Sequence, residues 1–272
     1  MTDILKTIAA DTRRRVDLVK TQVPYSKLKQ QALALTLALA AEKTGSYPFE
    51  EALAKSGLSV IAEVKKASPS KGLIDSDFDY LAIAQEYAAA GAAAISVLTE
   101  PNFFRGSPEY LRQIAAAVPV PVLRKDFIID DYQIYESKVL GASAILLICS
   151  LLTSAQLADY LAVADVLGLS ALVEAHDADE IKRALAVGAR VIGVNNRDLA
   201  TFNVDITTSQ RLRELVPAQI FFVSESGIKT PEDAAQLAVY GVDAVLIGES
   251  LMRCSDKHGF INRIRQLQAQ TD

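Results

Sequence analysis

Short apolar segments rich in β-branched residues recur along the chain, and each is followed by a polar turn and an Ala-rich stretch. A continuous apolar run between turn signals is typical of a strand that is covered on both faces. The runs start at intervals of roughly 20 to 35 residues, a suitable length for one βα unit. The predicted strands are residues 60–64, 94–98, 120–124, 144–148, 171–174, 191–194, 220–223 and 244–247.

Glycine-containing pairs precede several of these runs, beginning at Gly91, Gly141, Gly188 and Gly241. Glycine at such a position suits the end of the preceding helix. Strands and helices that alternate eight times predict a closed α/β barrel of the (β/α)8 type, the TIM barrel. The rival architecture, a doubly wound open sheet, usually has an early Gly-rich dinucleotide turn, and the sequence has none.

The first 57 residues lack this alternation and have helical composition. Ser26 is the expected cap of a helix over residues 27–42, which are rich in Ala and Leu. We therefore predict an N-terminal helical extension, residues 1–57, packed on a single (β/α)8 domain that comprises residues 1–272. The chain ends soon after the eighth unit, so we expect no fused second barrel.

Composition narrows the classes of partner. The formal net charge of −5 does not favour nucleic acid, whose phosphates need a basic face. Residues 139–158 carry no charge and are long enough to span a bilayer, but their Ser and Thr residues favour strand, loop and helix. Charged residues precede any long apolar run, so we expect no signal peptide, no membrane association and a cytoplasmic protein. Two cysteines and two histidines, without a CxxC pattern, predict neither a disulfide nor a zinc site.

Ionisable residues gather where the predicted strands end. Glu63 and Lys65 lie two residues apart and therefore face the same way, and Lys125, Glu174 and Asn195 end other strands. Buried charges are costly unless paired and shift their pKa values, which makes these residues candidates for acid and base chemistry. The alternative for any one of them is a salt-bridge network that plugs the barrel.

Glycines mark a candidate phosphate site in the loops after strands seven and eight, where such barrels often bind phosphate. Ser226-Gly227 and Gly248-Glu249 lie there, and Ser68 on the loop after strand one could close a third side. Glycine lets backbone N–H groups approach an anion. We expect Glu249 to use its backbone and to turn its carboxylate away; the alternative is that the glycines only turn the chain.

Three aromatic residues, Phe103, Phe104 and Phe127, follow strands two and three. They could wall a pocket for a flat ring, with ordinary loop packing as the alternative.

These motifs resemble those of the indole-3-glycerol-phosphate synthase family over nearly the whole chain. The strand-one motif is Ile61-Ala-Glu63-Val-Lys65-Lys-Ala-Ser68-Pro69-Ser70, and the likeness continues through residues 104–107, 123–128, 172–174, 193–199, 224–228 and 246–252. The N-terminal extension matches less closely, at Val23-Pro24 and Leu28.

The resemblance implies a carboxy-lyase of tryptophan biosynthesis that uses no metal and no organic cofactor. It would close the indole ring of 1-(2-carboxyphenylamino)-1-deoxyribulose 5-phosphate and release carbon dioxide and water. By resemblance, Lys125 is the general acid for ring closure, and Lys65 holds the substrate carboxylate and serves in the loss of hydroxide. Glu174 is the base or the cation stabiliser for dehydration, and Glu63 tunes the lysines and binds a substrate hydroxyl. Which lysine acts in which step stays open.

The same resemblance assigns the binding residues. Asn195, Arg197 and Ser226 would orient the substrate, and Glu225 would pair with the lysines. Phe104 and Phe127 are the candidate walls for the aryl ring. Ser68, Gly227, Gly248 and Glu249 would hold the phosphate. A monomer is expected, with a phosphorylated small molecule as the partner.

Three rivals remain open from the sequence. A phosphoribosylanthranilate isomerase would need a Cys/Asp pair, for which Cys149 has no obvious partner. A Schiff-base aldolase would trap substrate on Lys125 or Lys65. A barrel that binds a phosphorylated metabolite without turnover would not need a complete acid–base set.

Overall fold

A computed structural model describes residues 3–42, 47–198 and 201–268, and its centre is a closed barrel of eight parallel strands. The first strand, β1, pairs with both β4 and β10, which closes the ring. Every predicted strand is present, so the TIM-barrel prediction is confirmed. The strands are β1 (Ser59–Val64), β4 (Ala94–Leu98), β5 (Val122–Lys125), β6 (Ala144–Ile148), β7 (Ser170–Ala175), β8 (Val191–Asn195), β9 (Phe221–Glu225) and β10 (Ala244–Ile247).

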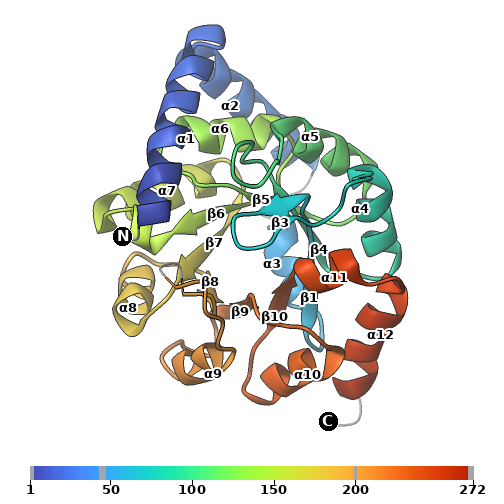
Figure 1. Cartoon of the computed structure of the whole chain (residues 1–272). Helices are drawn as coiled ribbons and strands as arrows, with labels where there is room; N and C mark the ends of the chain where they lie inside the picture. The colour runs from blue at the N-terminus through green and yellow to red at the C-terminus, as the bar shows by residue number, and fades with distance from the viewer. Residues whose placement is uncertain (1–2, 43–46, 199–200, 269–272) are drawn as a thin grey trace.

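Helices form an outer ring around the strands (Figure 1). The predicted glycines end helices in the left-handed conformation, for example Gly91 at φ 92° and Gly141 at φ 89°. The ring contains α4 (Tyr80–Ala89), α5 (Pro108–Ala117), α6 (Tyr132–Val139), α7 (Ser154–Val166), α8 (Ala178–Ala186), α9 (Thr207–Arg213), α10 (Pro231–Val239) and α12 (Lys257–Gln268). Short elements are β2 (Ala67–Ser68), β3 (Gly72–Leu73), η1 (Cys149–Leu151) and α11 (Glu249–Arg253).

Inside the barrel, the character of the side chains changes from apolar to charged along the strands. Ile61, Leu123, Leu172 and Val223 belong to the buried apolar cluster within the barrel. The residues two positions further on are Glu63, Lys125, Glu174 and Glu225. Because side chains alternate, these charged groups also point inward, one layer nearer to the carboxyl ends. The strands therefore carry a packed floor and a charged layer above it.

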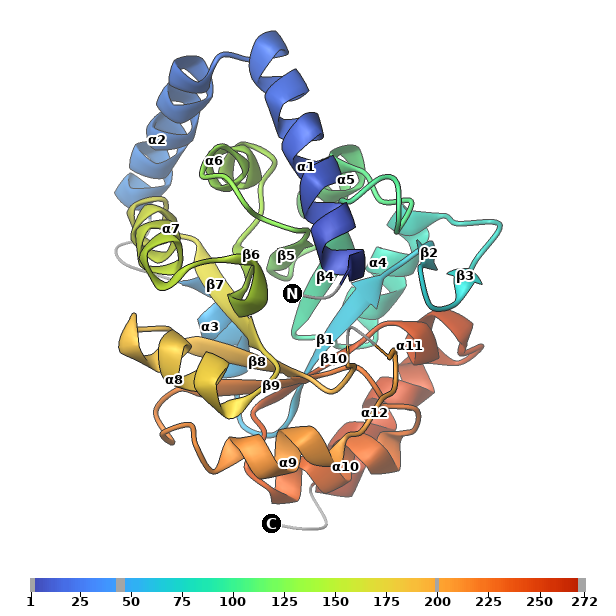
Figure 2. The ribbon, with the colours of Figure 1, turned by 60° about the vertical axis from the view of Figure 1, so that its left-hand side comes forward.

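The N-terminal extension contains α1 (Asp3–Gln22), α2 (Tyr25–Glu42) and α3 (Pro48–Leu53). Phe49 and Leu53 of α3 pack into the inner apolar cluster, so this helix closes the amino-terminal end of the barrel. In Figure 2, α1 and α2 diverge from the turn that joins them, with α6 between them, and the N-terminus of α1 points toward the strands. Ion pairs from Arg13 to Asp130 and from Arg15 to Asp126 fasten α1 to the loop after β5.

The prediction that Ser26 caps the second helix is wrong. The helix begins at Tyr25, and Leu28 N already donates to Pro24 O at 3.1 Å, so Ser26 lies in the first turn. The Tyr25 hydroxyl donates to Asp131 Oδ2 at 2.5 Å, which anchors the first residue of the helix, two residues before the predicted start.

The uncharged segment 139–158 contains the end of α6, strand β6, η1 and the start of α7, as predicted. Thr153 caps α7 through a capping box with Gln156. None of the helices in the described ranges is long and apolar enough to cross a membrane. Both cysteines are free, and Cys149 is buried.

Candidate active site

A cavity of about 620 Å³ opens at the carboxyl ends of the strands. Its lining includes every residue to which the family resemblance assigns a role. These residues are Glu63, Lys65, Ser68, Phe104, Lys125, Phe127, Glu174, Asn195, Arg197, Glu225, Ser226, Gly227, Gly248 and Glu249. The predicted strand ends converge because all eight strands run parallel and present their carboxyl ends at one mouth.

Lys125 lies between two buried carboxylates at the centre of this cavity. Its Nζ is 3.3 Å from Glu225 Oε2 and 3.4 Å from Glu174 Oε2. Neither oxygen of Glu225 has a hydrogen-bond partner with good geometry among the described residues. The Lys125 ammonium therefore does not satisfy both carboxylates by hydrogen bonding. Lys125 keeps donor capacity and Glu225 keeps acceptor capacity for a ligand.

The charges in this group shift one another's pKa values. Burial alone would lower the pKa of Lys125, but Glu225, Glu174 and Glu63 outweigh it and raise that pKa. Burial, helped by the charges of Glu174 and Glu63, raises the pKa of Glu225 to about 7 although Lys125 opposes the shift. Burial also opposes ionisation of Glu174, yet Lys125 and His176 lower its pKa. We conclude that Lys125 is charged, Glu174 is ionised and Glu225 titrates near neutral pH.

Lys65 and Glu63 form a second pair beside this group, on the wall made by β1. The Lys65 ammonium contacts Glu63 Oε1 directly, and the Glu63 side chain is only 5% exposed. This contact confirms that both side chains face into the barrel, as the two-residue spacing predicts.

Two glycines make room for these carboxylates. A Cβ at Gly193 would lie 2.3 Å from Glu225 Oε1, and one at Gly248 would lie 2.2 Å from Glu63 Oε1. Any side chain at either position would displace a charged group of the site. Gly248 was predicted as a phosphate-binding residue, and this packing against Glu63 and Lys65 is a second requirement for glycine there.

The loop after β9 has an uncommon backbone that the structure holds in place. Ser226 and Gly227 both adopt left-handed conformations, with φ of 68° and 89°. For a serine this conformation is strained, and such strain clusters at functional sites. Asn196 Nδ2 donates to Ser226 O at 3.0 Å. A Cβ at Gly227 would lie 2.5 Å from Val204, so only glycine fits the closed loop.

The carboxylate of Glu249 is paired with cations. Lys71 Nζ lies 3.4 Å and Arg253 Nε 3.3 Å from Glu249 Oε1. These pairs reduce the repulsion that the carboxylate would exert on a bound phosphate. Nearby, Ser250 Oγ donates to Ile228 O at 2.6 Å and joins the loops after β9 and β10.

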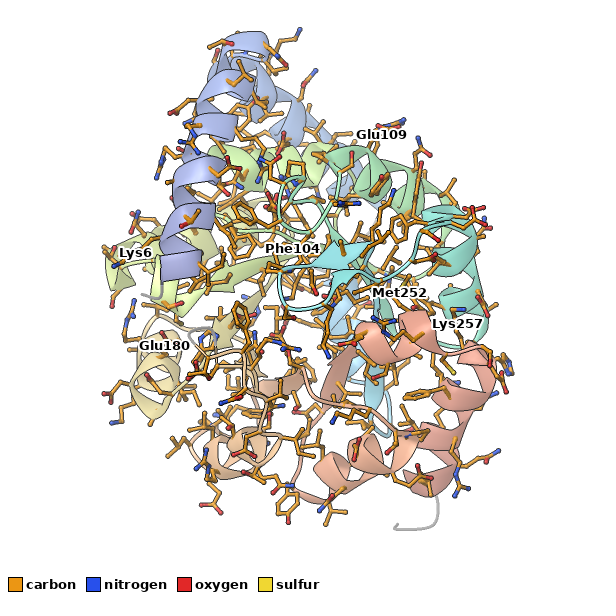
Figure 3. All side chains as sticks on the ribbon, in the orientation of Figure 1. Lys6, Phe104, Glu109, Glu180, Met252 and Lys257 are labelled. Atoms are coloured by element: carbon orange, nitrogen blue, oxygen red, sulfur yellow. The ribbon has the colours of Figure 1, made fainter. Side chains whose placement is uncertain are left out.

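The aromatic residues divide between the cavity and its surroundings. Phe104 and Phe127 line the cavity with ring centroids 5.9 Å apart, and Figure 3 shows Phe104 over the centre of the barrel. Phe103 is absent from the lining, so the alternative of ordinary loop packing holds for this residue. Its N–H donates to Glu100, which shapes the loop after β4 instead.

Sequence reasoning missed two groups of lining residues. The first comprises Ile4, Leu5 and Ile8 on α1, which place the extension at the cavity mouth. Their apolar spacing on a helix was a signal for burial, but it did not identify the surface they cover. The second comprises Phe202, Asn203 and Val204 after β8. Arg197 Nη1 donates to Phe202 O at 3.2 Å and holds this loop; Leu199, the last residue of the matched motif there, lies outside the described residues.

Metal-ligating side chains do not cluster in the described part of the chain. Within residues 3–42, 47–198 and 201–268, no group of three or more His, Cys, Asp and Glu side chains is arranged to hold a metal ion.

Comparisons with known proteins agree with this geometry. The model of the family "Indole-3-glycerol phosphate synthase" matches residues 5–264. A relative from Ruminiclostridium cellulolyticum with the same description is 53% identical over 96% of this chain and 98% of its own length. A relative from Endomicrobium trichonymphae with the same description is 52% identical over 97% of this chain and 99% of its own length.

Solved structures support the fold. A 3-hexulose-6-phosphate synthase from Salmonella typhimurium aligns with a TM-score of 0.65 at 15% identity, and covers 79% of this chain and all of its own. A structure described as native KDPGal aligns with a TM-score of 0.55 at 16% identity, and covers 79% of this chain and 97% of its own. At these identities the likeness extends to the barrel architecture.

Proposed function

The chain belongs to the indole-3-glycerol phosphate synthase family, and on that basis we propose which of its residues act in each step of the reaction. The reaction is that of a decarboxylating lyase in tryptophan biosynthesis. It converts 1-(2-carboxyphenylamino)-1-deoxyribulose 5-phosphate into indole-3-glycerol phosphate, with release of carbon dioxide and water. The substrate has an aryl carboxylate at one end and a phosphate at the other.

The observation that carries the assignment is the position of Lys125 near the carboxylates of Glu225, Glu174 and Glu63, in the charged layer of the barrel. Ring closure needs an acid that protonates the ribulose carbonyl oxygen while the aromatic carbon attacks the carbonyl carbon. A charged lysine with unused donor capacity suits that step. Lys125 is this acid, and Glu225 keeps it charged and positioned.

Lys65 binds the carboxylate that is later lost as carbon dioxide. Its ammonium is compact and already paired with Glu63, which orients it toward the cavity. Once decarboxylation restores the aromatic ring, Lys65 assists the departure of hydroxide, and Glu63 binds a substrate hydroxyl.

Glu174 is the base of the dehydration. It is buried and ionised, and it lies opposite Lys125, the proposed acid. Two neighbouring groups can act as acid and base when their environments shift their pKa values in different directions. Asn195, Arg197 and Ser226 orient the sugar chain between the two ends of the cavity.

Binding at the two ends uses different chemistry. Phe104 and Phe127 enclose the flat aryl ring, and Ile8 of the extension adds an apolar contact. Ser68, Gly227, Gly248 and the backbone of Glu249 hold the phosphate, where the loops after β1, β9 and β10 meet.

Beyond the site, we infer that residues 1–272 form one domain and that the extension over residues 1–57 packs on it. The ion pairs from α1 to the loop after β5 and the packing of α3 support this. We also propose a monomeric cytoplasmic enzyme that uses no metal or organic cofactor and does not bind nucleic acid or membranes.

A direct assay tests the proposal. Purified protein is mixed with the carboxyphenylamino-deoxyribulose phosphate in the presence of EDTA, and indole fluorescence is followed. Product formation at the same rate with and without EDTA is expected; absence of product with properly folded protein would refute it. Borohydride treatment with substrate serves as the arm for an aldolase: a covalent adduct on Lys125 or Lys65 would replace the acid assignment by Schiff-base chemistry.

A further inference from the structure

His176 lies directly behind Glu174 and is absent from the residues that line the cavity. It follows the end of β7 and precedes α8, on which Glu180 occupies the first turn. Although His176 lies one residue beyond the strand, its ring is placed against the Glu174 carboxylate. Figure 3 shows Glu180 on α8 at the edge of the barrel, so the three residues lead outward from the site.

Glu180 holds the imidazole ring from the outer side. Its Oε2 accepts the His176 backbone N–H at 2.8 Å and lies 3.1 Å from His176 Nδ1. The His176 and Glu180 side chains are only 19% and 14% exposed. A carboxylate that binds both the main chain and the ring fixes the ring orientation, as carboxylates do for metal-binding histidines.

The other ring nitrogen faces Glu174. His176 Nε2 lies 3.4 Å from Glu174 Oε1, while Lys125 Nζ lies 3.4 Å from Glu174 Oε2. Nε2 is buried and has no hydrogen-bond partner with good geometry among the described residues. Both separations exceed an ordinary hydrogen bond by a few tenths of an ångström, and such contacts often tighten when substrate binds.

The charges around Glu174 and His176 favour the protonated imidazole ring. On its inner side, Glu174 interacts with Lys125 from β5, Glu225 from β9 and Asn195 from β8, and Glu63 acts on Glu225 from β1. Burial alone would lower the pKa of His176, but Glu180, Glu174 and Glu225 outweigh it and raise that pKa.

Two further groups lie on the outer side, near Glu180. The Cys149 thiol donates to the Glu180 main-chain oxygen, and burial raises its pKa to about 12, so it stays neutral. The guanidinium of Arg183 is occupied by main-chain oxygens of Cys149 and Leu152. Neither group competes with the imidazolium for the Glu180 carboxylate.

We propose that His176 is a positioning residue for the dehydration step: an imidazolium clamped by Glu180 that fixes Glu174 and keeps it deprotonated as the base. Lys125 holds one oxygen of Glu174 and His176 the other, so the carboxylate keeps its orientation when the substrate engages Lys125. This inference rests on the proposed role of Glu174.

The pH dependence of kcat tests the proposal. His176→Ala removes charge and donor and is expected to lower kcat about tenfold, with KM within about twofold and the acid limb moved to higher pH. His176→Gln keeps an amide donor without the charge. It should recover most of kcat above the limb, but with the limb still displaced. His258→Ala, which changes an exposed histidine paired with Asn262, is the matched control.

NMR gives a second readout, independent of turnover. The chain has only two histidines, so ¹⁵N-imidazole spectra report on His176 with His258 as an internal control. Glu180→Gln and Glu174→Gln each remove a negative charge beside the ring, so each should lower the pKa of His176 and leave His258 unchanged. If the His176 ring titrates identically in the wild-type protein and in both variants, the proposal is overturned.

The turnover of the Glu174→Gln variant separates this inference from the proposed function. If Glu174→Gln retains full turnover, the assignment of Glu174 as the base fails, and the role of His176 fails with it. If Glu174→Gln is inactive while both His176 variants keep the wild-type kcat and acid limb, only the inference about His176 is overturned. Loss of thermal stability without a displaced limb would also overturn it, because that result indicates a purely structural role.

Discussion

Two charged clusters lie on consecutive residues of β5, on opposite sides of the barrel wall. Arg124 points outward to α6. Its Nε donates to Thr99, its Nη1 to Gln133 O, and its Nη2 lies 2.8 Å from Glu136 and 3.0 Å from Asp126. Lys125 points inward, with carboxylates no nearer than 3.3 Å.

In the outward cluster, both oxygens of Asp126 and every guanidinium nitrogen of Arg124 have a partner. Asp126 also binds Arg15 of α1, accepts the Thr99 hydroxyl and accepts its own neighbour's N–H at Phe127. Burial would raise the pKa of Asp126, but Arg124 and Arg15 outweigh it and hold that pKa at about 2. The inward cluster, in contrast, leaves the oxygens of Glu225 without hydrogen bonds. Complete pairing fixes the loop that carries the site, and incomplete pairing leaves capacity for substrate.

The sharpest test of this division is Lys125→Met, which removes the inward cation while keeping most of the side-chain volume. Turnover should fall by about 10³-fold, the range of a lost general acid. Affinity for indole-3-glycerol phosphate should change by less than about tenfold, because the phosphate end is intact. Stopped-flow fluorescence and equilibrium titration measure the two quantities. Retained turnover would remove Lys125 from the acid role.

The neighbouring substitution, Arg124→Met, should have the opposite balance. It leaves Asp126 and Glu136 without their buried cation, at a cost of about 3–5 kcal/mol in the free energy of unfolding. Urea unfolding measures that loss. Enzyme that remains folded should retain turnover within about tenfold. If Arg124→Met were as inactive as Lys125→Met while fully stable, the two clusters would not differ in function.

The sequence predicts the strands well because each is covered on both faces and therefore appears as an apolar run. The strand boundaries depend on local chemistry. The sequence predicts residues 120–124 for the third strand, but β5 is Val122–Lys125. Pro121 has no N–H with which to extend the hydrogen bonds between the strands. The inward Glu63, Lys125 and Glu174 were identifiable because they interrupt such runs at one end.

Other parts of the site depend on contacts that no local pattern encodes. Arg15 and Asp126 are 111 residues apart, and the apolar face of α1 could have covered any part of the barrel. The spacing of His176 and Glu180 was visible, but their alignment behind Glu174 follows from the turn between β7 and α8. The sequence therefore predicts which residues reach the barrel mouth, and tertiary packing decides what surrounds them.

Glu225 should give the inward cluster a pH-dependent stability. Its pKa is raised from an ordinary value of 4.5 to about 7, so between these two pH values the folded protein binds more protons than the unfolded chain. Stability from this group is therefore present at low pH and is lost as pH rises through that window. Glu225→Gln should abolish this slope, seen as a smaller difference in Tm between pH 5 and pH 8. An unchanged slope would mean that Glu225 is ionised throughout.

The smallest expected effect concerns Arg15, which joins the extension to the outward cluster. In Arg15→Gln, Asp126 keeps Arg124, Thr99 and the Phe127 N–H, so the loss should be about 1–2 kcal/mol. Arg14→Gln is the matched control: its side chain is 77% exposed and pairs with Asp11 three residues away, so stability should change by less than about 0.5 kcal/mol. Urea unfolding of both variants measures the difference. Equal effects would show that the Arg15–Asp126 pair stabilises the protein no more than the exposed Arg14–Asp11 pair. Arg15 would then not belong to the outward cluster.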